Sequence, residues 1–140
     1  MNDNIRDVMT DSPCAVNVTT SITGAARAMR ENDIGDIIVL DGDRLYGILT
    51  DRDIVVRGLA DDKDPSTTAV GEICSRELTT VKPSDSVGSA VRLMRERALR
   101  RLPVVDERGT VVGIVSLGDL AVERDPRSAL ADISAAPPNV

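Results

Sequence analysis

The chain has 140 residues, of which 41% are hydrophobic and 29% charged, a composition typical of one globular domain or of two small repeats that share a core. A net charge of −6 and a single aromatic residue, Tyr46, argue against binding to nucleic acid. The absence of histidine excludes Ser-His-Asp and Cys-His catalysis and removes the commonest transition-metal ligand, so we expect neither an enzyme nor a metal site.

The chain is a tandem duplication of one sequence unit, and this duplication sets the order of its predicted elements. AARAMREND (25–33) aligns with AVRLMRERA (90–98) at an offset of 65 residues. Other corresponding positions are Gly47 with Gly113 and Asp53 with Asp119, after a slip of one residue, and DVMT (7–10) with EICS (72–75) upstream. We therefore expect the same elements in both copies.

In the first copy, apolar residues recur at helical spacing over 22–29 and predict an amphipathic helix. The apolar run DIIVL (36–40) predicts a buried strand, and after a turn LYGIL (45–49) predicts the return strand of a hairpin. Thr50 then begins a second helix, DRDIVVRGLA (51–60). The second copy repeats this order with a helix over 87–94, strands over 102–106 and 111–115, and a helix over 117–124.

Each copy is therefore predicted to be a strand–helix–strand–strand–helix unit of α/β (α+β) class. We place the first repeat at 5–62, a polar linker at 63–70, the second repeat at 71–124, and a tail of little periodicity at 125–140. A repeat of roughly 60 residues buries only a small core. We expect the two repeats to pack face to face about a pseudo-two-fold axis, with a related pair of clefts between them.

A short motif, Gly-x-x-Ser/Thr-x-x-Asp, occurs once in each copy, in GILTDRD (47–53) and GIVSLGD (113–119). A hydroxyl residue followed three positions later by an acid is also the capping box of a helix N-terminus. A single occurrence would indicate a helix cap and nothing more. Two occurrences at matching positions of packed repeats favour a pair of binding sites.

The order and double occurrence of these patterns resemble the CBS (cystathionine-β-synthase) domain, which occurs in tandem as a Bateman module. The resemblance covers residues 5 to about 124 and rests on DVM, AxxxM, RRLPVVD, GILTDRDI and GIVSLGDL. It implies a non-catalytic regulatory module whose clefts bind an adenosine ligand: AMP, ADP or ATP foremost, or S-adenosylmethionine or an NAD-type compound. It also implies a homodimer that signals to a partner protein.

The resemblance gives each motif residue a role. The aspartates, Asp53 and Asp119, accept hydrogen bonds from ribose hydroxyls, and the hydroxyl residues, Thr50 and Ser116, contact a phosphate. Physical chemistry agrees, because an ionised carboxylate is a pure acceptor and the start of a helix favours an anion.

The two sites are not expected to be equal. Just before its central strand the second copy has Arg100 and Arg101, where the first copy has Gly35 and Asp36. Arginine suits phosphate, whereas an aspartate repels it. Since adjacent side chains of an extended segment point to opposite faces, we expect one of the two arginines to reach the cleft. The site of Ser116 and Asp119 is therefore the stronger candidate, although Arg52 partly compensates in the first copy.

By resemblance, the walls of the adenine pocket come from the first strand of one copy and the central strand of the other. The residues at these positions are Ala15, Val16, Leu102 and Pro103 for one cleft, and Thr80, Ile37 and Ile38 for the other. Most of them would be core residues under any interpretation. One alternative function stays open, a ligand-free interaction or structural module whose capping boxes serve stability alone.

The two cysteines, Cys14 and Cys74, provide no disulfide framework. We interpret both as small buried hydrophobes, with an intermolecular disulfide or a redox role as the alternative. The opening MNDNIRDVM lacks the apolar core of a signal peptide, and no stretch has the length of a membrane span. We expect a cytoplasmic protein.

Overall fold

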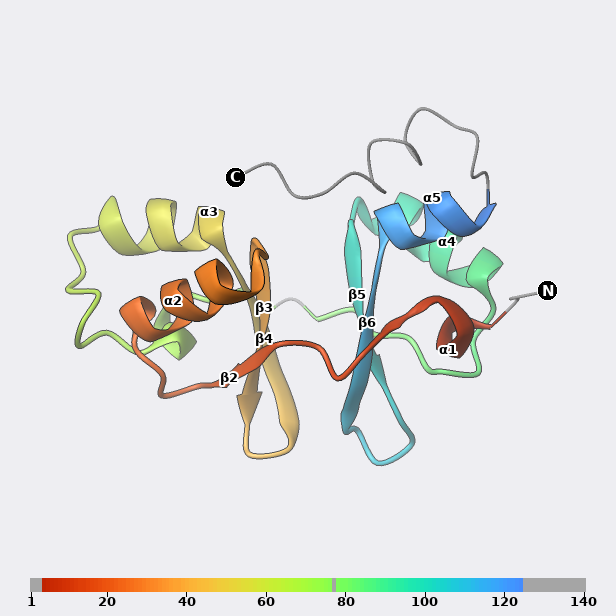
Figure 1. Ribbon diagram of the computed structural model, residues 1–140, viewed down its shortest axis with the longest axis horizontal. Coiled ribbons are helices and arrows are strands. Elements are labelled where there is room, and N and C mark those ends of the chain that lie inside the picture. The colour runs from red at the N-terminus through yellow and green to blue at the C-terminus, as the bar shows by residue number, and fades with distance from the viewer. Residues whose placement is uncertain (1–3, 77, 125–140) are drawn as a thin grey trace. The chain divides into compact units, whose positions relative to one another are not determined.

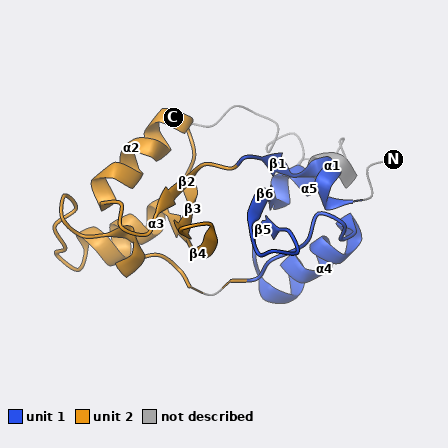
Figure 2. Ribbon diagram, turned by 90° about the horizontal axis from the view of Figure 1, so that it is seen from below, with its two compact units in different colours: residues 1–12, 79–139 blue, residues 13–78, 140 orange. Residues whose placement is uncertain are grey.

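The computed structural model describes residues 4–76 and 78–124 of the chain (Figure 1). The chain divides into two compact units, each of which takes in parts of both copies (Figure 2). Unit 2 spans residues 13–78 and contains most of the first copy. Unit 1 joins the chain up to Ser12 with the chain from Thr79 onward and contains most of the second copy. The predicted limits of the repeats and the pseudo-two-fold axis stay predictions.

Unit 2 is a three-stranded sheet with its helices on one face (Figure 1). Strand β3 lies between β2, which is parallel to it, and β4, which is antiparallel to it. The elements, in chain order, are β2 (Ala15–Asn17), α2 (Ile22–Asn32), β3 (Asp36–Asp41), β4 (Arg44–Thr50), α3 (Asp51–Asp53), the π-helix η1 (Ile54–Leu59) and the 3-10 helix η2 (Val70–Glu72).

Unit 1 has a similar arrangement, except that a single β-bridge takes the place of one of the strand pairings of unit 2. Its sheet has the order β1-β6-β5, and a single parallel bridge between Val81 and Val104 stands where β2 pairs with β3 in unit 2. The elements are α1 (Ile5–Val8), β1 (Thr10–Asp11), α4 (Val87–Arg97), β5 (Arg101–Val105), β6 (Val111–Ser116) and α5 (Leu117–Arg124). The predicted α/β class is confirmed, and so is the order helix–strand–strand–helix in each copy, while the first strand predicted for the second copy is reduced to the bridge at Val81.

The two long helices begin and end in the same way, as the duplication predicts. Ser21 caps α2 by accepting a 3.0 Å hydrogen bond from the Gly24 N–H, and Ser86 caps α4 through the Ser89 N–H at the same distance. Both helices stop at a residue in the left-handed region. These residues are Asp33, with φ 52°, and Ala98, with φ 53°.

The second helix of the first copy differs from the expected α-helix. After the single turn of α3 the chain continues as a π-helix, whereas α5 of the second copy is a regular α-helix. The segment IVVRGL combines β-branched residues with a buried glycine, Gly58, and both are poor α-helix formers. A Cβ on Gly58 would lie 3.4 Å from the Ile22 side chain, so the wide turn seats this glycine closely against α2.

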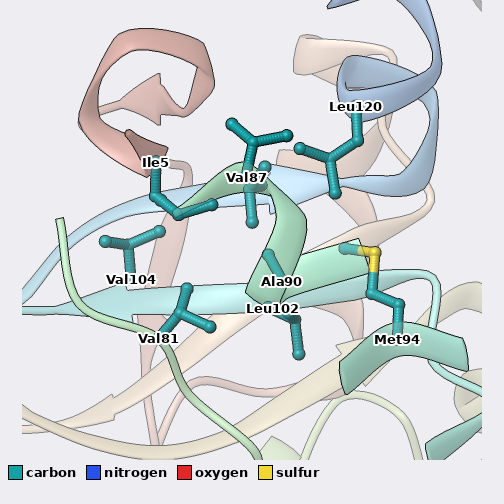
Figure 3. Packing of buried hydrophobic residues seen from close by; sticks show 9 residues of the cluster. Ile5, Val81, Val87, Ala90, Met94, Leu102, Val104 and Leu120 are labelled. Carbon is teal, nitrogen blue, oxygen red and sulfur yellow. The ribbon is translucent and has the colours of Figure 1, made fainter. Parts of the chain in front are cut away.

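Each unit has its own hydrophobic core of aliphatic side chains between helices and sheet. The core of unit 1 is shown in Figure 3 and includes fully buried Ile5, Leu102 and Val115. The core of unit 2 is built around Ile37, Leu49 and Ile73. Without Phe or Trp, the cores are filled by Ile, Leu, Val, Met and Ala, as the composition predicts.

The opening segment of each copy packs on the other copy. Ile5 is in the core of unit 1, and β1 pairs with β6 of the second copy. In the same way Val70 and Ile73 are in the core of unit 2, and Ser75 bridges to Ile48 of the first copy. Val70 is the last residue of the predicted linker, yet it is fully buried.

Because each opening segment packs on the other copy, we call it an exchanged segment. The motif glycines, Gly47 and Gly113, leave room for these segments. A Cβ on Gly47 would lie 2.5 Å from the Ser75 carbonyl oxygen, and one on Gly113 would lie 2.9 Å from the Thr10 carbonyl oxygen. Both glycines therefore admit the backbone of the exchanged segment. At these positions the lack of a side chain allows a close approach of protein backbone.

Candidate functional site

Both motifs form complete capping boxes. In the first copy the Thr50 N–H donates to Asp53 Oδ2 at 2.9 Å, and the Asp53 N–H donates to Thr50 Oγ1 at 3.1 Å. In the second copy the Ser116 N–H donates to Asp119 Oδ2 at 3.1 Å, and the Asp119 N–H donates to Ser116 Oγ at 3.0 Å. The residues of each motif thus have the same local geometry in both copies.

Capping engages only part of each carboxylate. The Thr50 and Ser116 amides bond to Oδ2, and an ionised carboxylate offers about four acceptor positions on its two oxygens. The Asp53 side chain is 15% exposed, and Asp119 is half-buried. A capping aspartate at either place keeps the capacity to accept hydrogen bonds from a ligand, so helix capping and ligand binding are compatible.

The cross-strand neighbours of the two hydroxyl residues carry opposite charge. Arg101 lies opposite Ser116 in the β5–β6 pair, and Asp36 lies opposite Thr50 in the β3–β4 pair. Directly opposite residues share a face of the sheet and lie close to one another. Arg101 therefore lies beside Ser116 in the second copy, and Asp36 lies beside Thr50 in the first copy.

Arg100 is placed differently from Arg101. Its carbonyl oxygen accepts a 2.7 Å hydrogen bond from the Leu117 N–H, just as the Gly35 carbonyl accepts one from Asp51 at 2.9 Å. This backbone bond joins the residue before β5 to the start of α5 in unit 1, and the residue before β3 to the start of α3 in unit 2. Because the Leu102 side chain is in the core, alternation puts the Arg101 side chain on the other face, with that of Ser116.

The residues predicted to form the walls of the adenine pocket lie on both faces of the sheets, because side chains alternate along a strand. Ile37, Leu102 and Val16 pack in or against the cores, so only their backbone groups are available to a ligand. Ile38 and Pro103 are buried, and their strand positions put their side chains on the face away from the core of their own unit. Ala15 pairs with Ile38 in parallel register and is exposed.

Thr80, the remaining wall residue, is exposed and borders a cavity of about 330 Å³ in unit 1. The cavity lies against α4 and is lined by Thr80, Val81, Asp85, Ser89, Arg92, Leu93 and Glu96. No motif residue is among these lining residues. The cavity is therefore separate from the Ser116–Asp119 capping box.

Sequence reasoning missed Arg57, which the structure places beside Asp53. The Arg57 Nε lies 3.9 Å from Asp53 Oδ1, and its Nη1 donates a 3.4 Å hydrogen bond to the Ile73 carbonyl oxygen. Arg52, the arginine expected to compensate in the first copy, is exposed on the preceding turn. The signal that was available is the spacing of four residues from Asp53, which puts two helical side chains side by side.

Both cysteines lie in unit 2, where burial raises the pKa of each thiol above its ordinary value. Cys74 is 6% exposed and belongs to the core, and the nearby Asp53 carboxylate adds to the rise of its pKa. Arg76 and Arg57 act in the opposite direction on the Cys74 pKa. The interpretation of small buried hydrophobes fits Cys74 best, while Cys14 is only partly buried.

The described ranges 4–76 and 78–124 contain neither a metal-binding cluster nor a membrane-spanning helix. Within them, no three or more His, Cys, Asp or Glu side chains gather into a group able to hold a metal ion. None of the helices described there is long and apolar enough to cross a membrane.

The comparisons with known proteins agree on one family. A model of the CBS domain matches residues 5–59 and 70–124. Hypoxic response protein 1 of Mycobacterium tuberculosis is 41% identical over 117 residues, which are 83% of this chain and 81% of that protein. The CBS domain-containing protein YhcV of Bacillus subtilis is 40% identical over 134 residues, 93% of this chain and 94% of that protein.

Solved structures have the same fold. Hypoxic response protein I, crystallised with two coordinated zinc ions, superposes with a TM-score of 0.77 at 39% identity, covering 86% of this chain and 98% of that one. The CBS domain pair of protein MJ0100, in complex with 5′-methylthioadenosine and S-adenosyl-L-methionine, gives 0.79 at 26% identity, covering 91% and 100%. CBSX2 in complex with AMP gives 0.75 at 26% identity, covering 87% and 96%. The chain therefore belongs to the CBS-domain family and carries two CBS domains in tandem.

Proposed function

We propose that this chain is a non-catalytic sensor that binds an adenosine nucleotide, with Asp119 holding the ribose and Ser116 and Arg101 holding the phosphate. The observation that carries the proposal is the cross-strand pairing of Arg101 with Ser116, which sets a cation beside a hydroxyl at the start of α5. The AMP bound to CBSX2 and the adenosine compounds bound to MJ0100 support the choice of ligand class.

The chemistry of each group suits one part of the ligand. A carboxylate with a remaining acceptor oxygen matches the two donors of a ribose diol. A guanidinium presents donors in a fixed fork that matches phosphate oxygens, and the N-terminal end of an eight-residue helix favours negative charge. These groups converge at the end of β6, so a ligand that spans ribose and phosphate engages all of them.

The corresponding place in the first copy is the weaker site in this proposal. Its cross-strand neighbour is Asp36, which repels a phosphate, and α3 has only three residues before the π-helix begins. We expect an AMP-sized ligand to fill the second-copy site first. We further propose that the protein is a cytoplasmic homodimer and that ligand binding changes its contact with a regulated partner protein.

A second candidate function, a ligand-free interaction module, is favoured by one observation. Both capping boxes are complete without a ligand, so helix stabilisation alone accounts for the motif residues. The two functions differ in whether an adenosine compound stabilises the folded protein.

The deciding experiment is a thermal shift assay with AMP, ATP, S-adenosylmethionine and NADH. A ligand at about 100 times its Kd adds about 2.7 kcal/mol to the free energy of unfolding. Because Asp119 also caps α5, the informative variant is Asp119→Asn, which keeps a side-chain acceptor, with Asp53→Asn as its matched control. We expect Asp119→Asn to abolish the AMP shift and Asp53→Asn to leave most of it. No shift with any compound would favour the interaction module.

A further inference from the structure

The two copies place their cations at opposite ends of the motif. In the second copy the cation is Arg101, across from the hydroxyl residue, and the residue four positions after Asp119 is Glu123. In the first copy the residue across from the hydroxyl is Asp36, and the residue four positions after Asp53 is Arg57. The charges at the two positions are thus exchanged between the copies.

Arg57 is held in its place by two contacts. Its Nε lies 3.9 Å from Asp53 Oδ1, the oxygen that the capping box does not use, and its Nη1 donates to the Ile73 carbonyl oxygen at 3.4 Å. Ile73 is almost fully buried in the core, so its carbonyl is a fixed anchor. The guanidinium therefore stays near Asp53, although its side chain is 54% exposed.

A ribose at Asp53 would need the oxygen that Arg57 faces. The capping bond from Thr50 already engages Oδ2, so Oδ1 is the better acceptor for a diol. We propose that Arg57 is a built-in competitor for the Asp53 carboxylate and makes the first-copy site selective against ribose. The inference rests on the proposed function, because it treats the motif aspartates as ribose acceptors.

The competition sets how the two sites fill. A ligand at Asp53 must first displace the Arg57 guanidinium, whose Nε lies 3.9 Å from the carboxylate. An exposed ion pair contributes about 0.2–1 kcal/mol, which corresponds to a difference of about 1.4- to fivefold in Kd. The first-copy site therefore accepts a nucleoside only at higher concentration than the second-copy site.

The experiment is calorimetric titration of adenosine into the full chain. Asp119→Asn serves as the background that weakens the second-copy site, and Arg57→Gln is added to it. Adenosine has no phosphate, so loss of the cation does not weaken binding directly. Arg52→Gln is the matched control, because Arg52 is an exposed cation of the adjacent α3 turn. We expect Arg57→Gln to lower the adenosine Kd by about 1.4- to fivefold and Arg52→Gln to leave it unchanged.

A second ligand separates competition from a structural effect. 2′,3′-Dideoxyadenosine has no diol, so its affinity should not respond to Arg57→Gln. A gain of equal size for both ligands, or in both arginine variants, would overturn the inference, as would no gain at all. Arg57→Lys keeps the charge without the fork and should give a smaller gain than Arg57→Gln.

Failure of the proposed function has a different signature. If Asp119→Asn leaves the binding of AMP to the otherwise unchanged chain intact, the assignment of the stronger site is wrong, whatever Arg57→Gln does. If AMP binding is lost in Asp119→Asn and adenosine affinity does not respond to Arg57→Gln, the proposed function stands and only the role of Arg57 is refuted.

Discussion

The guanidinium carbon of Arg76 lies 3.6 Å from the centre of the Tyr46 ring, and the Arg76 Nε donates a 2.7 Å hydrogen bond to the Tyr46 carbonyl oxygen. Tyr46 is the sole aromatic residue of the chain and lies on β4 of the first copy. Arg76 follows Ser75, which bridges to Ile48 on the same strand. The pair thus holds an exchanged segment on the sheet of unit 2.

The first prediction concerns this pair. Replacing Tyr46 by Leu should lower the free energy of unfolding by about 1 kcal/mol beyond the effect of lost area, because a cation–π contact of this kind contributes about 0.5–1 kcal/mol. A double-mutant cycle with Arg76→Gln, followed by denaturant unfolding, measures the coupling directly. A coupling energy indistinguishable from zero would show that the stacking of Arg76 on Tyr46 does not contribute to stability.

The second prediction concerns the motif glycines. Gly47→Ala should destabilise the protein by about 1–3 kcal/mol, because the new methyl group would meet the Ser75 carbonyl oxygen and the Cys74 sulfur at 2.5 and 2.8 Å. Gly113→Ala should cost somewhat less, since its closest contact is the flexible Met9 sulfur at 2.6 Å and the Thr10 carbonyl oxygen, at 2.9 Å, is farther away than the Ser75 oxygen is from Gly47. Gly42→Asn, at a left-handed turn with open space, is the control and should change stability little. Equal costs at all three positions would contradict the proposed packing.

A third prediction follows from the left-handed end of α4. Ala98 has φ 53°, a conformation that is strained for alanine and free for glycine. Ala98→Gly should therefore raise the free energy of unfolding by about 0.5–1 kcal/mol. The same substitution inside α2, Ala26→Gly, should lower it by about 1 kcal/mol. Chemical unfolding of both variants tests the prediction, which fails if the two changes have the same sign.

The fourth prediction is a dependence of stability on pH. Burial raises the pKa of the Cys74 thiol above its ordinary value of 9.0 in the folded state. Above pH 9 the unfolded chain releases this proton while the folded chain retains it, so the stability of the protein should fall as pH rises towards the folded pKa. The measurement is denaturant unfolding of the Cys14→Ala variant from pH 8 to pH 10, with the Cys14→Ala/Cys74→Ala double variant as the reference, because the pKa of Cys14 is raised as well. A parallel loss in the reference variant would assign the effect to other groups.

The raised pKa also bears on the open question of a redox role. Because the thiolate is the reactive form, alkylation of Cys74 by iodoacetamide near neutral pH should be slower in the folded protein than in denaturant. Mass spectrometry of the Cys14→Ala variant isolates the Cys74 rate. Rapid alkylation of the folded protein would favour an accessible, reactive thiol.

Local patterns in the sequence were sufficient to predict the repeat, the element types and the capping boxes. The serines that cap α2 and α4, the hairpins and the hydroxyl–acid spacing of both motifs depend on residues within a few positions of each other. Such interactions depend mainly on backbone propensity and on short side-chain bonds. Two elements differ from the prediction: the π-helix at 54–59, where β-branched residues and Gly58 changed the expected helix type, and the first strand of the second copy, which is a single bridge at Val81.

Tertiary structure alone decided which distant residues meet. The packing of Ile5 in the core of the second copy and of Ile73 in the core of the first depends on chain crossings that no local pattern records. Strand register selected Arg101 over Arg100 as the neighbour of Ser116, because a shift of one residue turns a side chain to the other face. The anchoring of Arg57 by both Asp53 and Ile73 joins segments sixteen residues apart. The sequence by itself determined the two matching motifs, and the three-dimensional contacts made them unequal.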